Sequence, residues 1–419
     1  MRILVISNYY PPFEIGGWEQ LTNDVVQRLE HRGHAVHVLT SEHRAPELGQ
    51  AEAKIDRVLR LQSPNHEHYS PLRTLFWRSD EKRNRACVAR TISAFAPQVV
   101  FVNGIWNLSR GAAHQAELMC PGRVVYYVAS PWPTAPDAHD AYWTAPAARA
   151  WLRLPKRCAS ALALKWVDYS APRPKLDFRH VLCVSDFMRA YMVDEVGVPA
   201  SRVRVVYNGV DETVFVPADR APEAPQPPLR LLYAGGLLKD KGVHTALEAL
   251  SHLVNQLHVS DVHLTLVGSG DTQYERFLAS LVKGFGIAGF VTFHGRVPND
   301  HIARLMRGFD ALVFPSTGVE ALPRVVQEAM ACGLVVLGTT TGGTGEILRD
   351  GVNGFTFEPG DAVALAELIR RVASDVSLRA RLARAARLTV IESFTMDRMA
   401  AQIEAYLRQV NEPGPRIAA

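Results

Sequence analysis

Two glutamates in the stretch "FPSTGVEALPRVVQEAMACG" have a spacing that could serve chemistry. The stretch predicts a helix over Pro323–Cys332, because proline suits the first helical position and glycine the position just past the end. Glu320 then lies in the approach loop, and Glu328 lies about one and a half turns inside the helix. Two interpretations are open at this point. The carboxylates bind parts of one ligand, or Arg324 and Glu328 form an ordinary i,i+4 ion pair.

Three glycine-rich turns elsewhere follow predicted strands and precede predicted helices. In "YAGGLLKDKGVHTAL", Gly235 and Gly236 lead to Lys241 at the start of a helix. The helix dipole disfavours a lysine there unless an anion is present, so Lys241 suggests phosphate binding, with a solvated lysine as the alternative. "TTTGGTGEIL" (339–348) repeats the pattern. Gly16 and Gly17 in "YYPPFEIGGWEQ" would let backbone N–H groups approach an anion, or they form an ordinary turn.

Several other chemistries lack their motifs. The sequence has no P-loop and no G-x-S-x-G elbow, and "VGSGDTQ" has Gln273 where a dinucleotide fingerprint needs its third glycine. No Asp-x-Asp pair is present to hold a divalent ion, and "HEH" (66–68) has no further ligands nearby. We therefore expect no metal and no cofactor. The charge of a diphosphate would be met by Lys241, helix termini and backbone amides. The five cysteines are widely spaced, and we expect reduced, mostly buried thiols.

The elements that must position these residues form two α/β domains. Apolar strand-like runs alternate with helical patterns, which predicts parallel sheets covered on both faces. The predicted strands are 2–7, 35–40, 98–103, 123–129, 180–185 and 202–207 in the first half, then 229–234, 263–268, 290–295, 310–315 and 334–339. The predicted division is a Rossmann-like domain at 1–215, a proline-rich linker at 216–229, a second Rossmann-like domain at 230–390 and a final helix at 391–410.

Ligands of doubly wound sheets bind outside the carboxyl ends of the strands, so we expect the site in a cleft between the two domains. The final helix is expected to pack on another element, because the side chains of one of its faces are apolar and Thr395 is available as its N-cap. The apolar residues of this face are Met396, Met399, Ile403, Tyr406, Leu407 and Val410.

The composition is that of a globular chain with a basic first half. The 419 residues are 47% hydrophobic and 21% charged, with a net charge of +4. No apolar run reaches the roughly 18 residues of a membrane span, and we expect a cytoplasmic protein. Residues 149–179 carry eight basic and two acidic residues interleaved with aromatic and leucine side chains. This segment either contacts an anionic membrane at its inner face or packs on its domain as a solvated helix. Nucleic acid is not an expected partner, because no base-stacking module is present.

In six motifs that occur in order, the chain resembles the retaining glycosyltransferases of family 4, which have the two-domain GT-B fold. The hallmark of this family is two glutamates separated by seven residues and followed by Ala-Met-Ala-Cys-Gly, which here is Glu320 to Glu328 and "EAMACG". The resemblance continues through "YYPPFEIGG", "VSDFMRAYMVDEVGVPASRVRVVYNGVD", "LLKDKG", "FHGRV" and "GGTGEILRDGVNGFTFEPGD". A closing helix returns to the N-terminal domain in this family.

The resemblance implies a role for each matching residue. Glu320 would bind hydroxyls of the donor sugar, Glu328 the ribose, and Lys241 the diphosphate. The amides near Leu322, Arg324 and Val325 would meet the phosphates, Gly16, Gly17, Gly235 and Gly236 would approach them, and Arg296 and Val297 would lie near the base. The acceptor-side candidates are Ser130 and Trp132. Transfer in this family needs no protein nucleophile, because the departing phosphate takes the acceptor proton.

Two departures from the family pattern bear on activity. Gly236 stands where the family usually has arginine, and Ala129 and Ser130 stand where it commonly has His-Asp. The resemblance predicts metal-independent transfer from a nucleotide sugar to a carbohydrate, lipid-linked or small-molecule acceptor. A non-catalytic sugar-nucleotide binder and a phosphorylase-like sugar enzyme are the alternatives.

Overall fold

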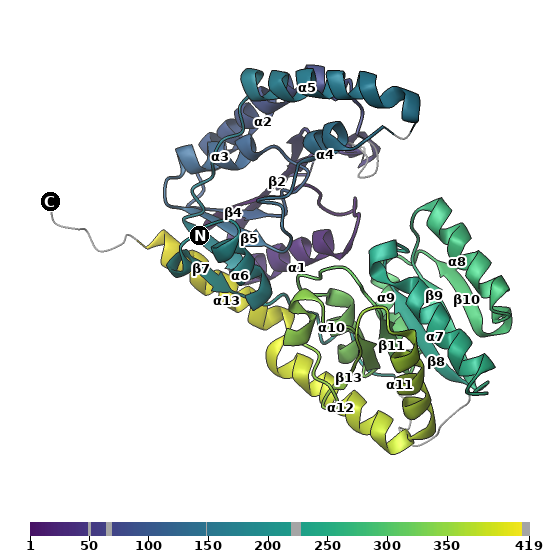
Figure 1. Ribbon diagram of the computed structural model, residues 1–419. Coiled ribbons are helices and arrows are strands. Elements are labelled where there is room, and N and C mark those ends of the chain that lie inside the picture. The colour runs from purple at the N-terminus through teal and green to yellow at the C-terminus, as the bar shows by residue number, and fades with distance from the viewer. Residues whose placement is uncertain (49–51, 64–68, 148, 219–227, 413–419) are drawn as a thin grey trace. The chain divides into compact units, whose positions relative to one another are not determined.

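The computed structural model describes residues 1–48, 52–63, 69–147, 149–218 and 228–412, and the chain forms two compact units (Figure 1). Unit 1 comprises Met1–Val184, Met188–Val206 and the chain from Ala400 onward. Unit 2 comprises Ser185–Phe187 and Tyr207–Met399. The main boundary therefore follows residue 206, nine residues before the predicted one. Most of the predicted linker, 216–229, and the whole of "HEH" lie outside the described residues.

Unit 1 is built on a seven-stranded sheet with the order β3-β2-β1-β4-β5-β6-β7 and parallel pairing throughout its described ladder. Its strands are β1 Arg2–Ile6, β2 Ala35–Ser41, β3 Ile55–Leu59, β4 Val99–Asn103, β5 Val124–Val128, β6 His180–Cys183 and β7 Val203–Val205. Its helices are α1 Gly17–His31, α2 Arg73–Phe95, α3 Arg110–Met119, α4 Ala138–Thr144, α5 Arg153–Ser170 and α6 Asp186–Asp194, of which α6 begins with two residues of unit 2.

Unit 2 is built on a six-stranded parallel sheet with the order β10-β9-β8-β11-β12-β13. Its strands are β8 Leu229–Ala234, β9 Val262–Val267, β10 Val291–Gly295, β11 Ala311–Phe314, β12 Val335–Gly338 and β13 Gly354–Thr356. Its helices are α7 Val243–Asn255, α8 Thr272–Gly284, α9 Asn299–Met306, α10 Arg324–Ala331, α11 Ala362–Ser374 and α12 Val376–Ser393. Helix α13, Met396–Asn411, begins in unit 2 and ends in unit 1.

Both faces of the second sheet are buried at the strands β11 and β12, as their continuous apolar runs predict. In β11, Ala311 and Val313 belong to a core that includes Leu247 of α7 and Leu365 of α11. The intervening Leu312 is also buried, although it lies outside that core. Successive residues of a strand point to opposite faces, so helices must cover both sides of the sheet. The predicted doubly wound architecture is confirmed.

The two strands that the sequence analysis missed are both at sheet edges. β3, with the sequence IDRVL, is half-buried and contains two charged residues. β13 has three residues and begins with a glycine. An edge strand has one neighbour instead of two and is partly solvated, so it does not require the continuous apolar run that marks a central strand.

The end of helix α13 packs on unit 1 through its predicted apolar face. The Thr395 hydroxyl accepts a hydrogen bond from the Arg398 amide at 3.2 Å, as expected of an N-cap. Ile403 and Leu407 are fully buried. Tyr406 lies 3.3 Å from the His180 ring nitrogen Nδ1. The predicted packing of the apolar face is therefore confirmed.

Glu404 adds an ionic contact between α13 and the turn after α1. Its carboxylate lies 2.9 Å from His34 Nε2 and 3.2 Å from Arg32 Nη1, and it pairs with Arg408 on its own helix. Burial raises the pKa of Glu404, but hydrogen bonds from Arg408 and His34 outweigh burial and lower the pKa from 4.5 to about 2.

This pKa predicts how stability depends on pH. The pKa is lower in the folded state than in the unfolded state, so ionised Glu404 stabilises the fold above pH 4.5 and loses its effect as the pH falls toward 2. Urea unfolding of Glu404→Gln is therefore expected to show a deficit against the parent protein near neutral pH that shrinks across this acid range. A deficit that stays constant with pH would assign the effect to packing instead.

Four of the five cysteines are buried free thiols, as predicted, and Cys158 on α5 is exposed. Burial raises the pKa of Cys183 and of Cys332 to about 12, so both are protonated at neutral pH. In the part of the chain that the structure describes, no helix is both long enough and apolar enough to cross a bilayer.

Candidate functional site

Lys241 and Glu320 follow the two strands at which the second sheet changes direction. From β8 the chain builds the sheet outward through β9 and β10, and it then returns to place β11 on the other side of β8. In doubly wound sheets, ligands bind at the carboxyl ends of the strands where the strand order reverses, which here are β8 and β11. The topology alone thus brings the two predicted residues to one edge of the sheet.

Their side chains form an ion pair at this edge. Lys241 Nζ lies 2.8 Å from Glu320 Oε1, with the lysine side chain 31% exposed and the glutamate side chain 13% exposed. The buried Ser316 hydroxyl donates a second hydrogen bond to the same oxygen at 2.7 Å. An ammonium group has three donors, and this contact uses one of them. Within the described residues, Glu320 Oε2 has no recorded hydrogen bond, so the carboxylate keeps capacity to accept from a ligand hydroxyl.

Backbone hydrogen bonds fix the loops that carry this pair. The Asp240 carbonyl accepts from the Thr317 and Gly318 amides, both at 2.8 Å, and this joins the loop after β8 to the loop after β11. The Glu320 carbonyl accepts from the Gly343 amide at 2.7 Å, which adds the loop after β12. Three neighbouring strands therefore hold the ion pair through their connected loops.

Gly342 permits the closest of these approaches. Its φ is +59°, and a Cβ added there would lie 2.2 Å from the Glu320 carbonyl oxygen. Gly342→Ala is therefore expected to lower the free energy of unfolding by about 1–3 kcal/mol and to displace Glu320. Gly345→Ala in the same turn is the matched control, because its Cβ would have an ordinary nearest contact of 3.6 Å to Thr340. Urea unfolding of both variants measures the effect, and equal stability would refute the steric argument.

Helix α10 matches the predicted helix to within one residue at each end, with Pro323 as its N-cap instead of its first residue. Arg324 Nε lies 3.4 Å from Glu328 Oε1, and both side chains are 14% exposed. The ion pair of the structural interpretation is therefore present. It does not exclude ligand binding, because both charged groups remain partly accessible beside the helix start. Leu322 is buried, and Val325 is half-buried.

The glycine-rich turn after β8 differs in detail from its prediction. Lys241 lies in a 3-10 turn, Lys239–Lys241, and α7 begins only at Val243. Gly242 has φ +67° and packs so closely on the Pro315 carbonyl that a Cβ there would lie 1.9 Å from its oxygen. Gly236 accepts a hydrogen bond at its carbonyl from the Tyr233 hydroxyl at 2.7 Å. The turn is thus held by its own sheet while Gly235 stays exposed.

The other glycine turn of this domain was also expected to open a helix. The "TTTGGTGEIL" segment instead forms a five-residue 3-10 helix, Gly342–Glu346. Its Glu346 carboxylate accepts from the Asp186 and Phe187 amides at 2.8 and 2.9 Å. This segment therefore supports the site by contacts with Glu320 and does not present a second long helix.

Arg296 and Val297 follow β10, the edge strand of the same sheet, and Arg296 is exposed. β10 is three strand positions from β11, or about 15 Å at the usual strand spacing. The structure thus places both residues on the same carboxyl edge as Glu320 but well separated from it. A ligand that reaches both must be extended.

Gly16 and Gly17 open α1 in unit 1, after β1. The Gly16 amide donates to the Glu19 carboxylate at 3.0 Å in a capping box, and burial raises the pKa of Glu19. Neither glycine is buried, and a Cβ on Gly16 would have nothing within 4 Å. One N–H of this helix start is therefore used internally, and the surroundings of Gly16 are open.

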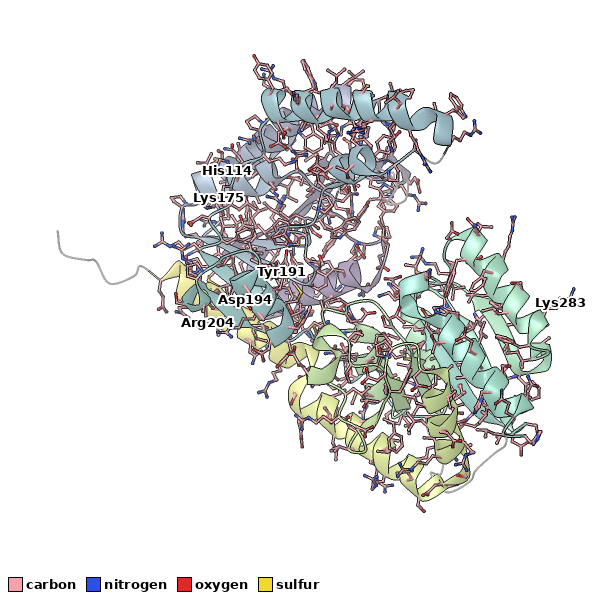
Figure 2. All side chains as sticks on the ribbon, in the orientation of Figure 1. His114, Lys175, Tyr191, Asp194, Arg204 and Lys283 are labelled. Carbon is pink, nitrogen blue, oxygen red and sulfur yellow. The ribbon has the colours of Figure 1, made fainter. Side chains whose placement is uncertain are left out.

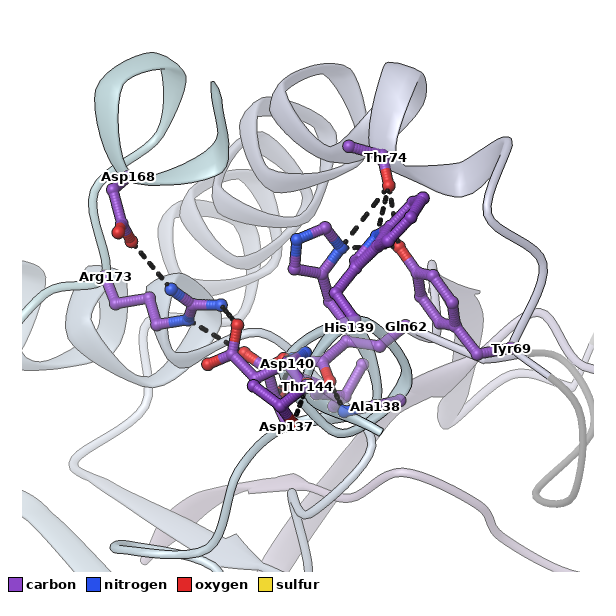
Figure 3. Close-up of polar contacts among 12 residues, drawn as sticks. Gln62, Tyr69, Thr74, Asp137, Ala138, His139, Asp140, Thr144, Asp168 and Arg173 are labelled. Atoms are coloured by element: carbon purple, nitrogen blue, oxygen red, sulfur yellow. Dashed lines mark hydrogen bonds and ion pairs between the residues drawn. The ribbon is translucent and has the colours of Figure 1, made fainter. Parts of the chain in front are cut away.

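Trp132, an acceptor-side candidate, lines a cavity of about 50 Å³ in unit 1, while Ser130 is not among the lining residues. The cavity lies at the carboxyl ends of β4 and β5, with Trp106 and Arg110 on the β4 side. Arg173 forms another part of the wall, and its guanidinium contacts Asp137, Asp140 and Asp168 at 2.6–2.9 Å (Figure 3). The cavity thus combines aromatic surface with fixed charges.

Three buried polar atoms at this cavity have no hydrogen-bond partner among the described residues: Trp77 Nε1, Glu81 Oε2 and Ser109 Oγ. Such groups are costly to bury unless water or a ligand satisfies them. These residues come from α2 and from the loop after β4, and no motif in the sequence marks them. Ser316 was also missed, because its contact with Glu320 depends on the path of the loop after β11.

The described residues contain no group of three or more His, Cys, Asp or Glu side chains arranged to hold a metal ion. The charges at the edge of the second sheet are instead the ammonium of Lys241, the guanidinium of Arg324 and the two glutamates. The arrangement can bind an anion and hydroxyl groups together.

Two sequence profiles match the chain. The profile described as Glycosyltransferase Family 4 matches residues 15–214, and that described as Glycosyl transferases group 1 matches residues 217–389. Among curated relatives, glycogen synthase of Mycobacterium tuberculosis (strain ATCC 25618 / H37Rv) is 32% identical over 236 residues, which cover 54% of this chain and 55% of that protein. The chain therefore matches about half the length of the relatives compared.

Solved structures match over nearly the whole chain. A glycosyltransferase from Rickettsia africae has a TM-score of 0.72 at 20% identity and covers 99% of each chain. Anabaena HepE, solved in complex with UDP and glucose, has a TM-score of 0.69 at 21% identity and covers 97% of this chain and 99% of its own. At these identities the likeness concerns the fold, which is GT-B. Because the two profiles together match most of the sequence, the chain belongs to the family 4 glycosyltransferases.

Proposed function

We propose that this protein is a retaining glycosyltransferase that moves a sugar from a nucleotide-sugar donor to an acceptor hydroxyl without a metal ion. The observation that carries the proposal is the Lys241–Glu320 ion pair at the switch point of the second sheet. A diphosphate needs cations and N–H donors, and a sugar needs hydroxyl acceptors. This edge of the sheet offers both within one connected group of loops.

Several predicted site residues of unit 2 have a role in this proposal. Lys241 and Arg324 meet the diphosphate with the first amides of α10, which lack partners within the helix. Glu320 binds sugar hydroxyls, Glu328 the ribose, and Arg296 and Val297 the base. The wide separation of β10 from β11 suits an extended ligand with its base at the sheet edge.

In the proposed mechanism, the departing phosphate acts as the base of the retaining step. One oxygen of Glu320 accepts hydrogen bonds from Lys241 and Ser316, which hold the carboxylate in place as a binding group. Transfer is accelerated by positioning of the two substrates and by stabilisation of the phosphate charge. The leaving phosphate oxygen takes the proton of the acceptor hydroxyl. Lys241 and Arg324 take the role that a divalent cation has in metal-dependent transferases.

A donor screen followed by a turnover assay tests this proposal. The protein is heated with UDP-, GDP-, dTDP- and ADP-sugars in turn. The unfolding temperature is expected to rise with the sugars of one base, because a ligand bound to the native state stabilises it. UDP-glucose is the first donor to test, since HepE was solved with UDP and glucose. Release of the nucleoside diphosphate with an acceptor panel, in EDTA, then measures transfer. NMR of the product anomer reports retention, and an inverted anomer would contradict the proposed mechanism.

A non-catalytic nucleotide-sugar binder is the second candidate. Gly236 in place of the family's usual arginine favours it, because one diphosphate cation is missing. A thermal shift without nucleotide release across the acceptor panel would support this candidate. Phosphate-dependent sugar release without a nucleotide would instead indicate a phosphorylase-like enzyme.

Trp132 is proposed to contact the acceptor. Its ring lies 5.8 Å from that of Phe178 and lines the cavity with Arg173. Trp132→Ala is expected to raise the KM for the acceptor by up to about tenfold, because an aromatic stacking contact contributes about 0.5–1.5 kcal/mol. The donor-dependent thermal shift is expected to stay unchanged. Steady-state kinetics with varied acceptor check this result, and an unchanged acceptor KM would remove Trp132 from the acceptor site.

A further inference from the structure

Helix α5 and the short 3-10 turn before it expose their largest apolar side chains to solvent. The exposed residues, with their exposed fractions, are Trp151 70%, Leu154 71%, Leu162 73%, Trp166 49% and Tyr169 87%. The buried residues of the helix are the smaller Ala163 and Val167. An ordinary surface helix turns its large apolar residues toward the core, so the polarity of α5 is reversed.

The spacing puts these side chains on one face. The positions follow one another by three, eight, four and three residues, and eight residues are about two helical turns. With 18 residues, α5 is about 27 Å long. Figure 2 shows a row of side chains projecting from α5 away from the rest of unit 1. We call Trp151, Leu154, Leu162, Trp166 and Tyr169 the apolar face of α5.

A second group of exposed apolar residues lies at the start of α2, which packs against α5. Leu72, Leu75 and Phe76 are 59–69% exposed. Helix α4 connects this turn to α5, because Trp143 Nε1 donates to Thr74 at 3.0 Å and the Lys156 ammonium lies 4.4 Å from the centre of the Tyr142 ring. A helix that packs against α5 therefore carries a second group of exposed apolar side chains.

Cationic side chains flank this surface. Arg153, Arg157 and Lys165 of α5 are exposed. Arginines already neutralise both acidic residues of the 149–179 segment: Arg173 pairs with Asp168 and Arg202 pairs with Asp177. An apolar face with tryptophan and tyrosine, bordered by unbalanced positive charge, matches an anionic lipid surface. The cations complement the headgroups while the apolar side chains enter the acyl boundary.

We propose that the apolar face of α5 docks on an anionic membrane surface. The proposal separates the two interpretations of the basic segment, because a solvated helix packed on its domain would turn these large side chains inward. Docking also has a consequence that rests on the proposed function. Ala171, Arg173 and Pro174, directly after α5, line the cavity assigned to the acceptor. A docked α5 brings that cavity to the lipid surface, so the acceptor class is lipid-linked.

Co-sedimentation of the full chain with phosphatidylcholine vesicles, with and without phosphatidylglycerol, tests the docking. We expect binding to the anionic vesicles that weakens at high salt. Leu162→Ser combined with Trp166→Ser is expected to weaken this binding roughly tenfold or more, because each buried side chain contributes to partitioning. Arg153→Glu combined with Arg157→Glu is expected to remove the preference for anionic lipid.

The matched control is Phe277→Ser combined with Leu388→Ser, which removes an aromatic and a leucine that are 46% and 57% exposed in unit 2. This control is expected to bind vesicles like the parent protein. Equal loss of vesicle binding in the α5 double variant and in the control double variant would overturn the proposal. Absence of vesicle binding by the parent protein would overturn it as well. A dimer in analytical ultracentrifugation without lipid that the α5 pair converts to monomer would also overturn it, since the face would then bind a second copy.

Failure of this inference can be distinguished from failure of the proposed function. The Leu162→Ser, Trp166→Ser variant is expected to keep the donor-dependent thermal shift of the parent protein. The parent's activity on a lipid-linked acceptor in anionic vesicles is expected to exceed that of the variant, while both act equally on a soluble acceptor analogue. Donor turnover without vesicle binding would refute docking alone, and vesicle binding without any donor shift would refute the proposed function alone.

Discussion

Replacement of Lys241 by alanine is expected to lower the rate of sugar transfer by about 10³-fold or more while the protein remains folded. The ammonium is the cation closest to Glu320, at 2.8 Å, in the described part of the site. Its removal takes away charge stabilisation from the departing diphosphate, an effect of several kcal/mol in sites from which water is excluded. It also leaves the largely buried Glu320 carboxylate without its counter-ion.

Lys239→Ala is the control for this prediction, because Lys239 is an exposed lysine in the same 3-10 turn. It is expected to retain the parent rate within about twofold, since an exposed charge is screened by solvent. Nucleoside diphosphate release measures both variants, with circular dichroism as the check on folding. A rate for Lys241→Ala within tenfold of the parent would contradict the assignment of the lysine to the diphosphate.

Replacement of Glu320 by glutamine is expected to lower transfer by about 10²-fold or more while nucleotide binding is retained. Glutamine keeps the shape of the side chain and can still accept from Ser316, but it loses the charge that binds Lys241 and strengthens hydrogen bonds from sugar hydroxyls. If Glu320 contacts the sugar, the affinity for the free nucleoside diphosphate changes little, whereas the affinity for the nucleotide sugar falls.

Calorimetric titration with the nucleoside diphosphate and with the nucleotide sugar distinguishes residues that bind the nucleotide from residues that bind the sugar. Glu328→Gln is expected to show the opposite pattern, with weaker binding of the nucleoside diphosphate itself, because Glu328 is assigned to the ribose. Glu358→Gln, an exposed glutamate of unit 2, is the neutral control. Equal losses for both ligands in Glu320→Gln would place this residue at the nucleotide instead of the sugar.

The sequence predicts the central strands and the site helix well because burial leaves a strong pattern. Central strands are covered on both faces, so they require continuous apolar runs, and β8 lies at the predicted residues. Edge strands such as β3 have no such requirement and were missed. The 3-10 turns at Lys241 and Gly342 were predicted as helix starts, because a glycine-rich turn does not specify how far the following helix extends.

The connections within the site could not be predicted from the sequence. That Ser316 holds Glu320, and that Gly343 donates to the Glu320 carbonyl, depends on which loops the sheet order makes neighbours. The orientation of α5 could not be predicted from the sequence either. Its basic and aromatic composition was readable, but whether Trp166 faces the protein or the solvent is set by packing against α2. The expectation that the ligand lies between the two domains stays a prediction.

The apolar face of the final helix was predicted from the sequence. Its apolar periodicity predicted the buried face that Ile403 and Leu407 form in unit 1. The chain leaves unit 1 after β7, whose end at Val205 precedes the proline-rich segment by more than ten residues. Proline content marks a stiff segment and does not by itself mark the change of core.

The most direct test of the account is nucleoside diphosphate release from the responding donor, in EDTA, by the parent protein, Lys241→Ala and Lys239→Ala. The account predicts acceptor-dependent release by the parent and by Lys239→Ala, and none above background by Lys241→Ala. Equal release by all three proteins, or release by the parent that requires an added divalent cation, would contradict it.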